Sequence, residues 1–97
     1  MSEPTFQQFE ANALAKGYDV VIERKWAADE VVDVHTHPFG VKALVVQGEM
    51  WLSFGGITRR FCPGDEFEMA AGVAHAECYG PEGATYWAAR RYTPQPG

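Results

Sequence analysis

Residues 29–48 have the sequence DEVVDVHTHPFGVKALVVQG and carry the strongest indications of the fold. Within this stretch, the segment 31–37 alternates β-branched side chains with polar ones, a pattern typical of a β-strand. Side chains two positions apart on a strand point to the same face, so His35 and His37 share one side of this segment. Their Cα atoms are then about 7 Å apart, which lets both imidazoles lean onto one ion. The stretch predicts a strand whose two histidines either bind a metal ion together or lie on the surface.

Strand patterns continue on both sides of this stretch. Glycine and proline mark the turns: Gly48 ends one expected strand, Gly55-Gly56 indicates a tight hairpin, and residues 80–83 (GPEG) indicate a loop. About eight short strands with turns every 8–12 residues or so are typical of an antiparallel sandwich or barrel. The expected strands are 18–26, 31–37, 41–46, 50–54, 57–61, 66–69, 75–79 and 84–92. The predicted fold class is all-β.

A short amphipathic helix is expected over residues 3–16. Ser2 can cap it, Pro4 suits a first turn, and Gly17 stands where a C-terminal capping glycine belongs. Its apolar face at helical spacing consists of Phe6, Phe9, Ala13 and Leu14. We expect this helix to pack against the strands.

The length of 97 residues predicts a single domain. It divides into a helical extension (1–17), a barrel (18–92) and a flexible tail (93–97). The net charge of −5 disfavours nucleic acid and anionic membranes as partners, because both attract basic surfaces. No signal peptide or run of about 20 apolar residues is visible, which predicts a cytoplasmic protein. Cys62 and Cys78 form no CxxC pair, and we expect two free thiols that are buried or half-buried.

The third and last histidine lies in a second telling stretch, residues 64–79, with the sequence GDEFEMAAGVAHAECY. His75 stands at the start of an expected strand. If that strand pairs with the segment containing His35 and His37, three imidazoles converge on one point. Three imidazoles suit a divalent ion such as zinc, iron or nickel, with copper and manganese as further candidates.

Both stretches resemble the two sequence motifs of the cupins. Residues 29–48 resemble the first motif, with HxH followed by a glycine eleven residues after the second histidine. Residues 64–79 resemble the second motif in the spacing of Gly64, Gly72 and His75. With their short spacer, the motifs cover about half of the chain. The resemblance implies a small antiparallel cupin or jelly-roll barrel that binds one divalent metal ion through three histidines.

Four positions depart from the cupin pattern. Asp29 stands where the first motif opens with glycine, and Val41 stands where it has a glutamate ligand. Ala70 and Tyr79 replace the proline and asparagine of the second motif. The loss of the glutamate changes the site, because three neutral histidines leave the charge of the ion uncompensated. Its open positions should then favour anionic donors.

Three further residues are candidates for the site. Glu77 lies two positions beyond His75, so it faces the same way and is expected to be a fourth ligand, a partner of a ligand or a general base. The alternative is that a bulge turns it to solvent. Tyr79 shares that face and is either a hydroxyl donor to an anion or a barrel-lining aromatic. Asp33 either orients a histidine or meets water.

Two arginine doublets, Arg59-Arg60 and Arg90-Arg91, each place one side chain inward and one outward on a strand. An inward arginine suits a substrate carboxylate, and a solvated pair is the alternative. Phe67 and Met69 are expected to line the cavity.

Two classes of function fit these residues. One is a metal-dependent enzyme, dioxygenase-like in one version, that acts on a small anionic molecule. The other is a barrel that binds or senses a small molecule without turnover. A barrel that keeps its histidines without a metal is a third alternative. The run 41–46 is apolar on both faces, so we expect Leu44 and Val46 to be covered by the helix and by a second copy in a homodimer.

Overall fold

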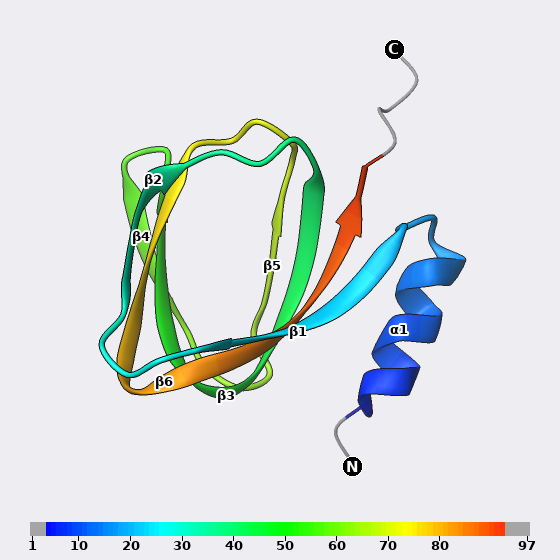
Figure 1. The fold of residues 1–97 in the computed structure, drawn as a ribbon, viewed down its shortest axis with the longest axis horizontal. Helices are drawn as coiled ribbons and strands as arrows, with labels where there is room; N and C mark the ends of the chain where they lie inside the picture. Colours follow the sequence, from blue (N-terminus) through cyan, green and yellow to red (C-terminus); the bar gives the residue numbers. More distant parts are fainter. Residues whose placement is uncertain (1–3, 93–97) are drawn as a thin grey trace.

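The computed structural model describes residues 4–92. They form one helix and six strands, and the strands curl into an open-ended barrel with the helix outside it (Figure 1). Every strand pairing among these residues is antiparallel. The elements are α1 (Phe6–Ala15), β1 (Val20–Trp26), β2 (Val31–His35), β3 (Gly40–Phe54), β4 (Ile57–Phe61), β5 (Glu66–Met69) and β6 (His75–Arg91). The predicted all-β antiparallel fold is confirmed.

Two long strands, β3 and β6, hold the barrel together. They pair with one another along most of their length, and each also pairs with two shorter strands. The first part of β3 pairs with β5 and its last part with β4. The first part of β6 pairs with β2 and its last part with β1. The expectation of about eight strands was wrong, because the segments on either side of Gly48 belong to one strand, as do those on either side of residues 80–83.

The expected turns at Gly48 and at residues 80–83 are bends inside the long strands. Gly48 pairs with Ala84, and the next pair is Met50 with Tyr79, so residues 80–83 bulge where both strands turn a corner. Gly48 has φ of 77°, and a Cβ atom there would lie 2.1 Å from the carbonyl oxygen of Gly83. Only glycine fits this close approach of two backbones.

A third chain segment reaches the same corner. Asp29, which replaces the glycine that opens the first motif, has φ of 58°. This left-handed conformation favours glycine and is tolerated by aspartate. The backbone N–H of Asp29 donates to the carbonyl of Gly80 at 2.9 Å. The departure from the motif therefore keeps the backbone conformation that glycine would adopt.

The helix begins later than the sequence predicts. The hydroxyl of Thr5 accepts from the Gln8 backbone N–H at 3.1 Å, and the Gln8 side chain accepts from the Thr5 N–H at 2.8 Å. This reciprocal pair fixes the first residue of α1 at Phe6, so Pro4 precedes the helix. The proposed cap Ser2 lies outside the described residues, as does the proposed tail 93–97.

The outer face of the sheet is covered in part by α1, as predicted. Phe9 and Ala13 pack with Leu44, Ala89 and Trp87 on this face. Leu44 is thereby buried, and the other side of β3 fills the barrel with Val45 and Leu52, each fully buried. The pairing of two copies through a sheet face stays a prediction.

Two smaller expectations concern the thiols and the membrane. Both thiols are free, and Cys62 is half-buried as predicted, whereas the expectation that Cys78 is buried or half-buried was wrong because its side chain is exposed. No helix within residues 4–92 has the length and apolar character needed to cross a membrane.

The corner at Gly48 generates a stability prediction. Gly48→Ala should lower the free energy of unfolding by roughly 3 kcal/mol or more, because strain at positive φ adds to a backbone clash. Gly56→Ala is the matched control, since Gly56 has a similar φ of 79° but nothing within 4 Å of the added Cβ. It should cost only about 1 kcal/mol. Urea denaturation measures the free energy of unfolding of both variants. Equal losses of this free energy would show that the corner has room for a Cβ atom.

Candidate metal centre

The three histidines come from two neighbouring strands and the segment after one of them. His35 is the last residue of β2, and it pairs directly with His75, the first residue of β6. His37 lies beyond the end of β2, so the expectation of a strand through residue 37 was wrong. The register of β2 is irregular between Val32 and His35, and Pro38 lacks the N–H that a continuing strand would donate. The predicted pairing of the strands that contain His35 and His75 is confirmed.

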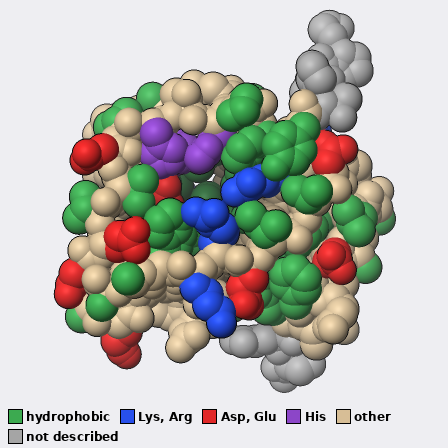
Figure 2. All heavy atoms as spheres, viewed as in Figure 1, with side chains coloured by type: hydrophobic (Ala, Val, Ile, Leu, Met, Phe, Trp, Pro, Cys, Tyr) green, Lys and Arg blue, Asp and Glu red, His purple; other side chains and the backbone are tan. Residues whose placement is uncertain are grey.

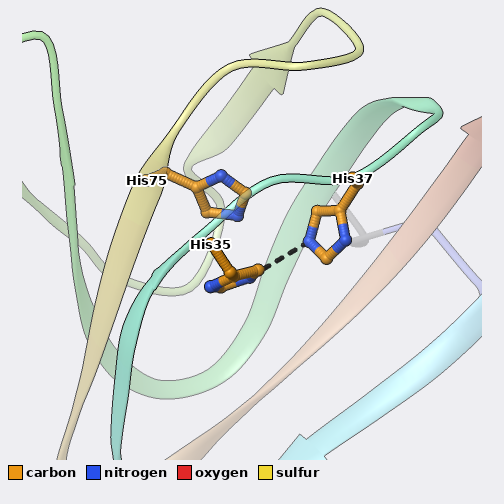
Figure 3. A group of neighbouring side chains, drawn as sticks. All are labelled: His35, His37 and His75. Atoms are coloured by element: carbon orange, nitrogen blue, oxygen red, sulfur yellow. Dashed lines mark hydrogen bonds between the residues drawn. The ribbon is translucent and has the colours of Figure 1, made fainter.

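The imidazole rings point toward a common centre (Figure 3). One ligand atom of each histidine lies within 4.8 Å of the others. The Nε2 atoms of His35 and His37 are 3.2 Å apart. An ion with metal–nitrogen bonds of about 2.1 Å separates its ligand atoms by about 3.0–3.4 Å. The donor set, and the spacing of the His35 and His37 nitrogen atoms, are therefore compatible with one divalent ion.

Backbone carbonyls orient two of the rings. The Nδ1 atom of His35 donates to the carbonyl oxygen of Asp33 at 2.8 Å, and that of His75 donates to Val73 at 3.0 Å. In a neutral imidazole the other nitrogen, Nε2, then holds the lone pair that a metal needs. The side chain of Asp33 is exposed, so its predicted role in orienting a histidine belongs to its main chain instead.

A buried carboxylate lies beside the histidines. Glu77 is only 5% exposed, so the alternative in which it turns to solvent is excluded. Its Oε2 atom lies 3.5 Å from Nε2 of His35 and 3.7 Å from Nε2 of His75. Its other oxygen, Oε1, accepts a short hydrogen bond from the hydroxyl of Tyr79. The arrangement directs Oε2 toward the nitrogen atoms of the centre.

Tyr79 lies behind Glu77 and does not line the hollow at the histidines. Its ring stacks on Trp26, with 5.0 Å between the centroids. Burial raises the pKa of Tyr79 far above its usual value, and Tyr86 and the hydrogen bond to Glu77 raise it further. The hydroxyl therefore stays protonated and donates to the Glu77 side chain, and its expected donation to a bound anion stays a prediction. The roles of Glu77 and Tyr79 in catalysis stay predictions.

His37 is held in its neutral form. Burial lowers its pKa from the ordinary value of 6.5, and the neighbouring His35 and His75 lower it further. Its ring also stacks on Phe39, with 4.7 Å between the centroids. A neutral imidazole is the form that binds a metal ion.

The histidines open onto a hollow of about 60 Å³. Phe67 and Met69 line it, as the sequence predicts. Arg24 and Arg90 also line it, and Lys and Arg side chains border the hollow beside the histidines (Figure 2). Sequence reasoning missed Arg24, although its position two residues before the half-buried Trp26 on β1 places both on one face.

The arginine doublets differ in their surroundings. Arg90 is the inward member of its doublet, whereas Arg91 donates to the carbonyl of Lys16 at 2.9 Å. In the other doublet both side chains are exposed, and Arg60 forms an ion pair with Glu49. The solvated alternative therefore holds for Arg59-Arg60 alone.

No protein-family model matches the chain, and no curated protein matches it either. Several solved structures, in contrast, are similar to this chain. KdgF from a Halomonas species is 24% identical, with a TM-score of 0.63 over 72% of this chain and 66% of its own. An RmlC-like cupin from Shewanella frigidimarina is 20% identical, with a TM-score of 0.68 over 78% and 68%. A cupin superfamily protein from Desulfitobacterium hafniense is 16% identical, with a TM-score of 0.62 over 76% and 80%.

These similarities establish the fold. The chain has the cupin fold, as its two motifs predicted. It spans about two thirds of the length of the Halomonas and Shewanella chains.

The lowered pKa of His37 generates a prediction for the metal-free protein. The unfolded chain takes up a proton on this residue at a higher pH than the folded chain does. Acidification from about pH 7.5 to about pH 5.5 should therefore reduce the free energy of unfolding. The His37→Gln variant should lose less of its free energy of unfolding than the wild type does over the same pH interval. Urea denaturation with a chelator present measures this, and equal pH dependence in both proteins would contradict it.

Proposed function

We propose that this cupin-fold chain is a metal-dependent enzyme that acts on a small anionic molecule, with His35, His37 and His75 holding one divalent ion. The observation that supports the ion is the convergence of three imidazoles beside the buried carboxylate of Glu77. A buried carboxylate is costly unless a positive charge or several hydrogen bonds compensate it. Tyr79 supplies one hydrogen bond, and neutral histidines supply no charge. A cation among the three Nε2 atoms would compensate Glu77 directly.

We assign Glu77 as the carboxylate of the centre, in the place of the glutamate that the first motif has at Val41. Tyr79 fixes one of its oxygen atoms, and the other faces two of the three ligand nitrogens. Glu77 reaches the ion from β6, whereas a glutamate at position 41 would reach it from β3. The change of strand leaves the β3 side of the centre apolar and open to a ligand.

The bound ion would supply a Lewis acid that polarises an oxygen atom of the substrate or of water. The chain supplies a half-enclosed hollow, two arginines at its wall and Glu77 as a proton acceptor or ligand. Three imidazoles with one carboxylate suit zinc, iron, nickel or manganese. Iron in the centre would favour the dioxygenase version of the proposal, which predicts oxygen uptake with an anionic substrate. Binding of an anion without turnover would favour the alternative of a sensing barrel.

Metal content tests the centre. The wild-type protein should retain about one equivalent of metal after reconstitution and desalting. His75→Ala should weaken metal binding by about 100-fold or more, because it removes a ligand, and Glu77→Gln by roughly 10- to 100-fold. Glu68→Gln removes an exposed carboxylate of β5 and should have no effect.

Mass spectrometry of metals and a competition titration with a chelator measure these affinities. A wild-type protein that binds no zinc, iron, nickel or manganese would refute the metal centre. Equal affinity of Glu77→Gln and wild type would refute the assignment of Glu77 as a ligand while leaving the three histidines in place.

A further inference from the structure

Arg90 lies directly across the sheet from Val41, the position at which the motif has a glutamate. The two residues are paired in the register of β3 and β6, and both line the hollow at the histidines. Side chains directly opposite in an antiparallel pair lie on one face with Cβ atoms about 4.5–5.5 Å apart. A glutamate at position 41 would therefore have had Arg90 as a neighbour. In this chain the arginine faces an apolar side chain instead.

Arg90 has no anionic partner among residues 4–92. Its Nε atom is buried and makes no hydrogen bond within the described part of the chain. Nη1 makes one long contact, 3.4 Å to the hydroxyl of Tyr92. Neither Arg90 nor Arg24 forms an ion pair with any residue in the range 4–92. The guanidinium groups of Arg90 and Arg24 thus have N–H donors without an acceptor in the described part of the chain.

The guanidinium of Arg90 is held close to the metal ligands. Its Cζ atom lies 4.5 Å from the ring centroid of Phe39, in a cation–π contact. The ring of Phe39 in turn stacks on His37 at 4.7 Å. Taken together, these two distances place the guanidinium no more than about 9 Å from the ring of His37. One small molecule can span that interval.

We propose that Arg90 binds the carboxylate of a small organic acid, which occupies the space above Val41 and replaces the missing glutamate. The inference deepens the proposed function, on which it rests, by naming the class of the anion. A guanidinium presents parallel N–H donors that match the two oxygen atoms of a carboxylate. The remainder of the acid then lies toward the histidines or toward a larger neighbouring hollow.

The surroundings limit the size of this acid. The hollow at the histidines measures only about 60 Å³, so an acid of a few carbon atoms suits it. A second hollow of about 350 Å³ shares Val41 and Met69 with the first. Arg24, placed over Trp26 at 4.7 Å, adds a second positive charge at the wall. These charges repel cations and favour acids over their neutral amides.

The test is binding of propionate and succinate to the zinc-loaded protein, measured by isothermal titration calorimetry. Propionamide is the uncharged control and should not bind. Arg90→Gln should weaken acid binding by roughly 10- to 100-fold, as expected for the loss of charge-assisted hydrogen bonds, and should retain its zinc. Arg59→Gln removes an exposed arginine that also lies over an aromatic ring, and it should bind the acid as the wild type does.

A second pair of variants tests the position of the acid. Val41→Glu introduces an internal carboxylate opposite Arg90, so it should abolish acid binding and strengthen zinc binding. Val41→Gln is similar in size and uncharged, and it should retain more acid binding than Val41→Glu. Thermal unfolding of each variant identifies those that are folded. An equal loss of acid affinity in both variants would show a steric effect. It would contradict the proposal that the acid occupies the place of the motif glutamate.

The outcomes separate this inference from the proposed function. Zinc binding with no affinity for either acid, or with equal affinity in Arg90→Gln, would overturn the role of Arg90 and leave the metal centre intact. Tighter binding of inorganic phosphate than of both acids would overturn the assignment to carboxylates. Acid binding that depends on Arg90, in a protein that binds no zinc, iron, nickel or manganese, would refute the metal centre and support the anion site.

Discussion

The structure depends on the close approach of β3 and β6 at one corner, where Gly48 meets Gly83. Because no Cβ atom fits between these backbones, both long strands turn together and stay paired on either side of the bend. The first residues of β6 then lie beside β2, which brings His75 opposite His35. The last residues of β6 lie beside the start of β3, which brings Arg90 opposite Val41. The two sides of the site are thus set by one bend.

The sequence predicted most of what depends on local periodicity. Alternation on strands placed Glu77 on the side of His75 and Phe67 and Met69 in the cavity. It did not predict the continuity of β3 through Gly48, because a glycine that ends a strand and one that bends it have the same local signal. The difference lies in a contact with residue 83, which is distant in the chain.

The errors around the site have a similar origin. The tautomers of His35 and His75 are fixed by main-chain carbonyls, which no side-chain pattern reveals. The carboxylate of Asp33 was expected to orient a histidine. An irregularity in β2 instead leaves this side chain exposed, and the backbone carbonyl of Asp33 accepts from His35. Arg24 was missed because it lies between two charged residues, Glu23 and Lys25, and such a run usually indicates a solvated face. Its inward position follows from the pairing of β1 with β6.

The replacement of one motif residue affects two functions at once. A glutamate at position 41 would have compensated both the ion and Arg90, whereas valine compensates neither. Glu77, whose Oε1 atom accepts from Tyr79, would compensate a bound ion from the other side of the centre, and it forms no ion pair with Arg90 among the described residues. The guanidinium of Arg90 is therefore left without a carboxylate partner, within the part of the chain that the structure describes, on the open side of the site. An arginine left in this way would be costly for a structural barrel, whereas for a protein that binds an acid it is a recognition element.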